Sequence, residues 1–267
     1  LSVYVKFELE DEPNTFMLAW TTTPWTLPGN VALAVRDNIE YVKVKTETGL
    51  LILAKSLVSL VEGEILDEFL GKDLFGKKYK PLWSFLADKM SVEERDKSFQ
   101  VYSADFVTTE DGTGIVHTAV MYGQDDFELG TKVGLPKYHI VKEDGTFKPE
   151  AGFLAGKFVK DEATDVDIIK ELAGRDLLFK KEPYTHTYPF CWRCKTPLIY
   201  FARDSWYIRM SELKDELVKE NAKINWEPAY IKEGRFGEWL AGVKDWAISR
   251  ERYWGTPLPV WRSEDKK

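Results

Sequence analysis

Three consecutive threonines, Thr21, Thr22 and Thr23, end an apolar run in the stretch WTTTPWTLPGN. Hydroxyls that only decorate a strand are expected to alternate with apolar residues, because successive side chains of a strand point to opposite faces. Threonine hydroxyls both donate and accept hydrogen bonds. The run therefore indicates backbone that leaves a sheet and offers its hydroxyls to a ligand or a water molecule, although a simple run of strand-forming residues is the alternative.

A histidine lies in a second informative stretch, GTGIVHTAVMYGQDDFELGTKVG. Its turn signals and apolar residues predict a strand from Ile115 to Val120, followed by a short loop and a helix that ends at Gly134. His117 shares one strand face with Ile115 and Ala119. His117 is then either a functional group at the end of the strand or a core histidine with a satisfied hydrogen bond.

Two acids precede the predicted helix. Asp125 and Glu128 have the spacing of a capping box, which predicts that Asp125 caps the helix N-terminus. Asp126 then falls in the first turn, where free N–H groups and the helix dipole are expected to keep its carboxylate ionised. An ionised Asp126 could bind an ammonium group, or it could merely complement the dipole.

Signatures of a covalent nucleophile or a catalytic metal are missing from the sequence, which has no GxSxG, HExxH or GxxxxGKS. Hydrolysis would therefore use a positioned water molecule. His186, Cys191 and Cys194 offer three nitrogen or sulfur ligands, one short of a tetrahedral zinc set. We expect no bound metal and no other cofactor, and a reduced hairpin around the CWRC motif.

The composition describes a chain that can bury a full core, with 267 residues of which 44% are hydrophobic. A net charge of −7 excludes a protein that coats long nucleic acids by charge alone. No apolar run approaches the roughly 20 residues that span a bilayer. Both cysteines lie in one cluster, which suits a reducing compartment. We expect a cytoplasmic protein that does not contact a membrane.

The fold class predicted is mixed α/β, with a β-barrel core decorated by helices. Residues 1 to about 60 alternate apolar and polar positions between turn signals, as in antiparallel sheet or barrel. Ser91 and Glu94 predict a capping box, and KELAG predicts a helix that ends at Gly174. The pattern of residue types changes near residue 184, which predicts two domains, 1–183 and 184–267. The second is expected to hold a ribbon in CWRCKTPLIYF, an amphipathic helix from Ser211 and another helix in EGRFGEWLAGV.

Four stretches, in this order, resemble the isoleucyl-tRNA synthetases: WTTTPWTLPGN, GTGIVHTA with GQDD, HTYPFCWRCKTPLI, and ISRERYWGTPLPVW. They span residues 20 to 261 and match the insertion that interrupts the Rossmann catalytic domain of these enzymes, with the first residues after it. The HIGH and full KMSKS signatures are missing, so amino-acid activation is not expected. In the valyl and leucyl relatives the first stretch typically reads TTRPET or TTRPDT, so TTTPWT favours the isoleucyl member.

The resemblance implies an editing domain that hydrolyses valine wrongly attached to tRNA(Ile). A synthetic pocket for isoleucine cannot strongly reject a side chain that is smaller by one methylene, so a second, smaller site removes the error. By motif position, Thr21, Thr22 and Thr23 would hold the water or the ester. Asp126 would hold the α-ammonium group of the misattached residue, and Asp125 keeps its capping role.

Three further residues are implied to bind the substrate. His117 would bound the amino-acid side chain, Asn30 would contact the terminal adenosine, and Trp20 would line the same site. The sequence departs from the family at Val120 and Met121, where Pro-Ala or Pro-Gly is common, so the loop before the acids is expected to differ in shape.

The partners implied are the 3′ acceptor end of tRNA(Ile) carrying valine and the rest of the synthetase chain. Basic side chains that could touch tRNA phosphates are Arg193, Lys195, Arg250 and Arg252, although scattered surface charge is their commoner meaning. Two alternative functions stay open. One is a valyl-type site that clears threonine, and the other is a catalytically silent module that only docks the acceptor end.

Overall fold

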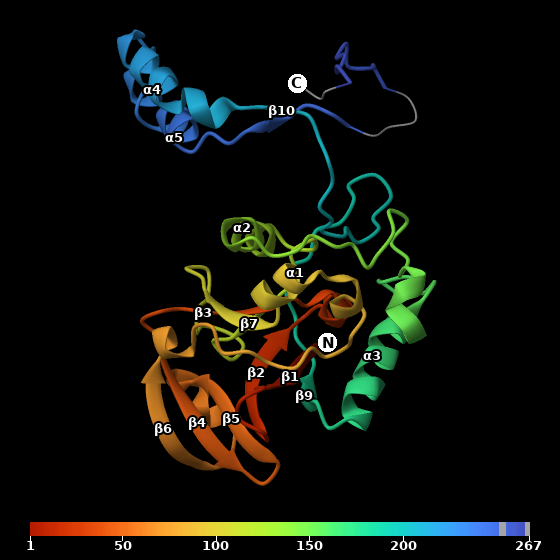
Figure 1. Cartoon of the computed structure of the whole chain (residues 1–267). Coiled ribbons are helices and arrows are strands. Elements are labelled where there is room, and N and C mark those ends of the chain that lie inside the picture. The colour runs from red at the N-terminus through yellow and green to blue at the C-terminus, as the bar shows by residue number, and fades with distance from the viewer. Residues whose placement is uncertain (251–254, 265–267) are drawn as a thin grey trace. The chain divides into compact units, whose positions relative to one another are not determined.

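The structure is a computed structural model that describes residues 1–250 and 255–264, so Arg252 lies outside the described residues. The chain divides into two compact units, Leu1–Ala202 and Arg203–Lys267 (Figure 1). The first unit thus extends beyond residue 184, near which the pattern of residue types changes. The functional division into 1–183 and 184–267 stays a prediction.

The first unit holds two β-sheets. The larger sheet has the strand order β6 (Glu64–Leu70), β4 (Glu40–Thr46), β5 (Gly49–Ala54), β2 (Thr15–Thr21), β1 (Ser2–Glu8) and β9 (Leu178–Glu182). The smaller sheet has the order β7 (Gln100–Ser103), β3 (Ala32–Val35) and β8 (Val116–Thr118). Two pairs, β2 with β5 and β3 with β7, are parallel, and the others are antiparallel. The mixed α/β class is confirmed, but no closed barrel is found among the described strands, so the barrel is unconfirmed.

The alternating pattern of β2 separates two apolar layers. Phe16 and Leu18 pack in a cluster with Tyr4, while Met17 and Ala19 lie in the main core on the other side. This is the period-two alternation that the sequence predicts for a strand covered on both faces. Trp20 and Thr21, the last residues of β2, therefore point in opposite directions.

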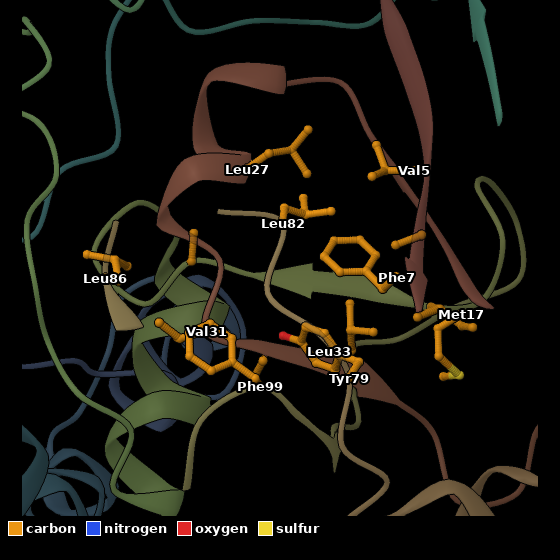
Figure 2. Close-up of a cluster of buried hydrophobic side chains, with 14 of the residues drawn as sticks. Val5, Phe7, Met17, Leu27, Val31, Leu33, Tyr79, Leu82, Leu86 and Phe99 are labelled. Carbon is orange, nitrogen blue, oxygen red and sulfur yellow. The ribbon is translucent and has the colours of Figure 1, made fainter. Parts of the chain in front are cut away.

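The main core lies where the two sheets meet. Phe7 from β1 packs edge-on against Tyr79, with ring centroids 5.3 Å apart, and Tyr79 packs in the same way against Phe99 at 6.2 Å. Leu33 from β3 joins them from the smaller sheet (Figure 2). Tyr79 also links the sheets through its backbone, which bridges Leu9. This core holds the turn after β2 against the strand that carries the histidine.

Five α-helices and seven 3₁₀ turns are described. The helices are α1 (Val92–Lys97), α2 (Gln124–Val133), α3 (Glu162–Gly174), α4 (Lys214–Lys223) and α5 (Arg235–Ala241). The 3₁₀ turns are η1 (Pro24–Gly29), η2 (Lys55–Leu60), η3 (Gly71–Leu74), η4 (Ala87–Lys89), η5 (Pro149–Leu154), η6 (Met210–Leu213) and η7 (Ala229–Ile231). Helix α3 lies beside β9 and contacts η1 (Figure 1). Among the described residues, no helix combines the length and apolar character that crossing a bilayer requires.

Several helix ends agree with the sequence and one does not. The Ser91–Glu94 capping box at α1 is confirmed, and α3 ends at Gly174 as predicted. Gly134 ends α2 with a φ of 73°, a left-handed conformation that glycine adopts without strain. The capping role of Asp125 is wrong. Helix α2 begins at Gln124, two residues earlier than predicted, with Gly123 in the N-cap position, and Glu128 accepts a hydrogen bond from the Gln124 side chain instead.

The second unit pairs β10 (Tyr207–Ile208) with β11 (Trp246–Ala247) and carries α4 and α5. The helix predicted from Ser211 starts as the 3₁₀ turn η6 and becomes α-helical at Lys214. The helix predicted in EGRFGEWLAGV is α5.

The ribbon predicted in CWRCKTPLIYF lies at the end of the first unit, where it is reduced to one bridge between Phe190 and Pro197 around a turn.

Candidate functional site

The threonine run lies where β2 ends and η1 begins, so the backbone leaves the sheet there as predicted. The Oγ1 atoms of Thr21 and Thr23 are 3.2 Å apart, and the Thr23 N–H donates to Thr21 Oγ1 at 3.1 Å. Thr23 Oγ1 in turn lies 3.3 Å from Thr26 Oγ1. Pro24 fixes the first turn because its φ is preset and it needs no N–H acceptor. The result is a short chain of hydroxyls; Thr22, beside it, is half-buried.

His117 completes this chain from another strand. Its Nε2 lies 2.9 Å from Thr26 Oγ1, and its backbone is held opposite Leu33 in the antiparallel pair β3–β8. The imidazole is buried, which lowers the pKa of His117 to about 4. It is therefore neutral at physiological pH. Its Nδ1 is buried with no hydrogen-bond partner among the described residues.

Thr26 is the residue that the sequence analysis missed. It sits three residues after Thr23, a spacing that places the two hydroxyls together only once the backbone turns into η1. It donates to the Thr23 carbonyl at 2.8 Å while contacting His117. A hydroxyl at position i+3 of a Pro-initiated turn is the signal that could have identified it.

Asp126 lies at the start of α2, where its Oδ2 accepts the Ala119 N–H at 3.0 Å. The half-buried position raises the pKa of Asp126 to about 7, because desolvation outweighs the hydrogen bond from Ala119. The nearby charge of Asp125 raises it further. The expectation that the helix end keeps Asp126 fully ionised is therefore wrong. At neutral pH this carboxyl is divided between its two protonation states.

The loop before Asp126 approaches the end of η1 closely. A Cβ placed on Gly29 would lie 3.0 Å from Tyr122 Cε2 and 3.7 Å from Ala119 Cβ. Ala119, which anchors the Asp126 carboxyl, follows His117 by two residues. The strand that presents the imidazole and the loop that presents the carboxyl are therefore packed against the end of η1.

The loop that differs from the family pattern is firmly held. Met121 accepts the Ala202 N–H through its carbonyl at 2.9 Å. The Tyr122 hydroxyl accepts the N–H groups of Ile140 and Val141 at 2.7 and 3.0 Å. These hydrogen bonds hold the segment before Asp126 in place.

Asn30 and Trp20 take positions apart from the hydroxyl chain. The Asn30 side chain is buried, accepts a hydrogen bond from the Tyr79 hydroxyl at 2.7 Å and donates to the Ala32 carbonyl at 2.9 Å. Trp20 faces away from Thr21 and packs edge-on against Tyr184, with ring centroids 5.0 Å apart. The internal bonds favour a structural role for Asn30, and the substrate contacts expected of both residues stay predictions.

The CWRC motif forms a tight turn with free thiols on Cys191 and Cys194. The Cys191 N–H donates to the Thr196 carbonyl at 2.8 Å, and Cys194 Sγ lies 3.0 Å from Thr196 Oγ1. The hydrogen bond with Thr196 lowers the pKa of Cys194 to about 7. Within the described residues, His186 and the two thiols do not form a three-ligand metal group. The expectation of no bound metal stays a prediction.

Comparison with known proteins identifies the family. Residues 19–267 match the family model described as tRNA synthetases class I (I, L, M and V). The chain belongs to this family. It is 48% identical over 265 residues to the isoleucine–tRNA ligase of Clostridium acetobutylicum, and 47% identical over 267 residues to that of Bacillus thuringiensis. These matches cover 98% and 99% of the chain, which confirms the resemblance to the isoleucyl-tRNA synthetases.

The chain spans about a quarter of the length of these curated relatives, with 25% of each covered. Among solved structures, the crystal structure of GlLeuRS-CP1 is similar with a TM-score of 0.51 and 13% sequence identity. The similarity covers 69% of this chain and 100% of that one. At this identity the likeness shows the fold alone, which is that of a CP1 domain over the matched part of the chain.

Proposed function

We propose that this chain is the editing part of an isoleucine–tRNA ligase and hydrolyses the ester that joins valine to tRNA(Ile). The observation that carries the proposal is the hydroxyl chain from Thr21 through Thr23 and Thr26 to the buried, neutral His117. The half-buried carboxyl of Asp126, in the first turn of α2, accepts the N–H of Ala119, which lies beside the end of η1. The high identity to isoleucine–tRNA ligases supports the choice of tRNA.

The reaction is an attack of water on the ester carbonyl. Water oxygen adds to the carbonyl carbon, and the tetrahedral adduct then breaks its bond to the ribose oxygen. That oxygen leaves as a hydroxyl with a proton that originates from the water, so the products are valine and uncharged tRNA. Thr21 and Thr23 hydroxyls orient the water and donate to the developing oxyanion. The neighbouring ribose hydroxyl of the tRNA terminus shares in this positioning.

Asp126 anchors the substrate and does not remove a proton from water. The α-ammonium of the bound residue stabilises the ionised form of a carboxyl whose pKa is raised to about 7 in the free protein. Binding therefore completes the ionisation of Asp126 and creates a desolvated charge pair. This pair fixes the ester in the orientation that presents its carbonyl to the threonines.

Selection for valine follows from the size of the site. His117 and Thr26 fix each other by the 2.9 Å contact, which makes the imidazole a rigid wall. Valine is one methylene smaller than isoleucine, so a wall at this position admits the wrong residue and excludes the correct one. The partners in this proposal are the acceptor end of tRNA(Ile) and the rest of the ligase chain, in the cytoplasm.

Deacylation assays test the proposal. Purified protein is incubated with Val-tRNA(Ile), Ile-tRNA(Ile) and Thr-tRNA(Val), and the loss of each ester is compared with its spontaneous rate. Rapid loss of Val-tRNA(Ile) alone is expected. Preferential loss of Thr-tRNA(Val) would identify a valyl-type site, and unchanged or slowed hydrolysis of all three esters would identify a silent docking module.

A further inference from the structure

Four rings follow one another at alternate positions of an extended segment: Tyr184, His186, Tyr188 and Phe190. Successive ring centroids are 5.8, 5.9 and 6.0 Å apart. Alternate residues of an extended chain share one side and advance about 7 Å, which accounts for this spacing. We call these four residues the aromatic ladder. Apolar rings in contact are normally part of a core, but this series runs along the exterior.

The far end of the ladder is exposed. Tyr184 and Tyr188 are half-buried, whereas Phe190 is 56% exposed and Trp192, two residues further, is 74% exposed. Each large ring left in water costs free energy unless a ligand covers it. The outer rings are therefore candidates for contact with a ligand.

The inner end of the ladder meets the candidate site. Tyr184 packs edge-on against Trp20, the residue directly before Thr21, with centroids 5.0 Å apart. Lys160 Nζ lies 4.1 Å from the centroid of the Tyr188 ring and 5.9 Å from that of Trp25 in η1. The ladder is thus joined to the segments on both sides of the threonine run, and it leads outward from them.

Positive charges accompany the rings in a chain whose net charge is −7. Lys160 lies over Tyr188, and the Arg193 guanidinium lies 4.6 Å from the centroid of the Trp192 ring. Lys195 is exposed in the same turn. One acid lies at the inner end, where Asp111 accepts the Tyr184 hydroxyl at 3.0 Å. Exposed rings with interleaved cations are the arrangement that binds unpaired nucleotides, because every base can stack and every nucleotide carries a phosphate.

We propose that the aromatic ladder, extended by Trp192 and Arg193, is a stacking platform for the unpaired 3′ nucleotides of the RNA that precede the esterified terminal adenosine. This inference rests on the proposed function, because the ester must lie at the threonine turn for the preceding nucleotides to reach the ladder. Stacking suits an unpaired end and not a duplex, whose bases are already stacked on one another. The ladder would hold the strand without reading its sequence.

Kinetics with two substrates test the platform in the full-length ligase. Val-tRNA(Ile) carries the preceding nucleotides, whereas 2′(3′)-O-valyladenosine carries only the terminal nucleoside. Phe190→Leu and Trp192→Leu should each raise KM for Val-tRNA(Ile) about tenfold, equivalent to about 1.4 kcal/mol and within the range for stacking one base. We expect kcat on Val-tRNA(Ile), and both constants on valyladenosine, to stay unchanged. Phe190→Tyr keeps a ring and should keep the wild-type KM.

Phe153→Leu is the matched control. Phe153 is 40% exposed and has Lys157 Nζ 5.9 Å from its ring centroid, yet it lies in η5 outside the ladder. Phe153→Leu should keep the wild-type KM and kcat for both substrates. If Phe190→Leu and Phe153→Leu change KM for Val-tRNA(Ile) equally, the platform proposal is overturned. A loss of melting temperature with equal loss on both substrates would also overturn it, by showing that the rings pack against the rest of the ligase.

Direct binding separates this inference from the proposed function. Fluorescence anisotropy with an uncharged, single-stranded oligoribonucleotide ending in CCA requires no hydrolysis. A tenfold weaker Kd in Phe190→Leu and Trp192→Leu supports the platform even if the wild-type protein fails to deacylate Val-tRNA(Ile). An unchanged Kd contradicts the platform even if deacylation is normal.

Discussion

The Thr26 hydroxyl and Nε2 of His117 lie 2.9 Å apart, although the two residues are separated by 91 positions in the chain. The contact joins η1 to β8, so the turn that carries the threonines and the strand that carries the imidazole cannot move independently. Because burial keeps His117 neutral, the contact is a hydrogen bond between uncharged groups. Such a bond fixes the imidazole without placing an ionised group there, as the proposed binding of an apolar side chain requires.

Replacing His117 by alanine is expected to enlarge the site. His117→Ala in the full-length ligase should begin to hydrolyse correctly charged Ile-tRNA(Ile), because the imidazole no longer excludes the larger side chain. The measurement is the deacylation rate of Ile-tRNA(Ile) beside that of Val-tRNA(Ile). A variant that spares Ile-tRNA(Ile) and only loses activity on Val-tRNA(Ile) would show that His117 acts in catalysis or in folding instead.

Removing the hydroxyl of Tyr79 tests the interior role of Asn30. Tyr79→Phe deletes the 2.7 Å hydrogen bond to Asn30 Oδ1 and leaves a buried amide oxygen without its donor. The expected cost is about 1 to 3 kcal/mol of unfolding free energy. Urea denaturation measures this loss. If Asn30 is only structural, KM for Val-tRNA(Ile) in the folded variant stays at the wild-type value, whereas a raised KM would favour the expected contact with adenosine.

Local patterns predicted the elements of the fold better than their pairing. The alternation of β2, the capping box of Ser91 and the glycine stop at Gly134 depend on neighbours in sequence, and all are present. The parallel pairing of β2 with β5 joins residues that no local signal connects. A closed barrel was expected because alternating strands occur in barrels and in open sheets alike. Strand periodicity does not distinguish the two.

Site prediction failed where a side chain has several alternative partners. The Asp125–Glu128 spacing matched a capping box, yet the helix begins two residues earlier and Glu128 accepts a hydrogen bond from the Gln124 side chain. The sequence indicated the helix dipole at Asp126, but the burial that raises its pKa depends on packing by distant segments. Thr26 was missed because its link to His117 exists only after the two sheets come together.

The raised pKa of Asp126 predicts a pH profile. In the free protein the pKa of this carboxyl is raised to about 7. Under the proposed clamp, only its ionised form binds the α-ammonium. kcat/KM for Val-tRNA(Ile) should therefore rise with pH through about 7. It should fall again as the substrate amine, whose pKa is about 8, loses its proton. A profile that is flat from pH 6 to 7.5 would contradict the assignment.

The same shift has a consequence for stability. The pKa of Asp126 is about 7 in the folded state and about 3.9 in the unfolded state. The contribution of this carboxyl to the free energy of unfolding is therefore fully present below about pH 4, and it is lost as the pH rises to about 7. Asp126→Asn, which cannot ionise, should therefore melt at or above the wild-type temperature at pH 8. Scanning calorimetry at pH 5 and pH 8 measures the difference.

Substitution of Asp126 separates a charge clamp from a merely polar contact. Removing one partner of a desolvated charge pair costs about 3 to 5 kcal/mol, which corresponds to roughly two to three orders of magnitude in kcat/KM. Asp126→Ala should show this loss in deacylation of Val-tRNA(Ile). Asp126→Asn should be nearly as inactive, because an amide preserves the shape but cannot neutralise an ammonium group.

Asp125→Asn is the matched control, because Asp125 is the exposed neighbouring acid and forms no side-chain cap of α2. It should retain the melting temperature and nearly normal deacylation. Its only expected effect is a small shift of the pH profile to lower pH, since the Asp125 charge helps to raise the pKa of Asp126. Near-normal activity in Asp126→Asn, measured beside this control, would rule out the ammonium clamp and leave Asp126 with a role in holding the loop through Ala119.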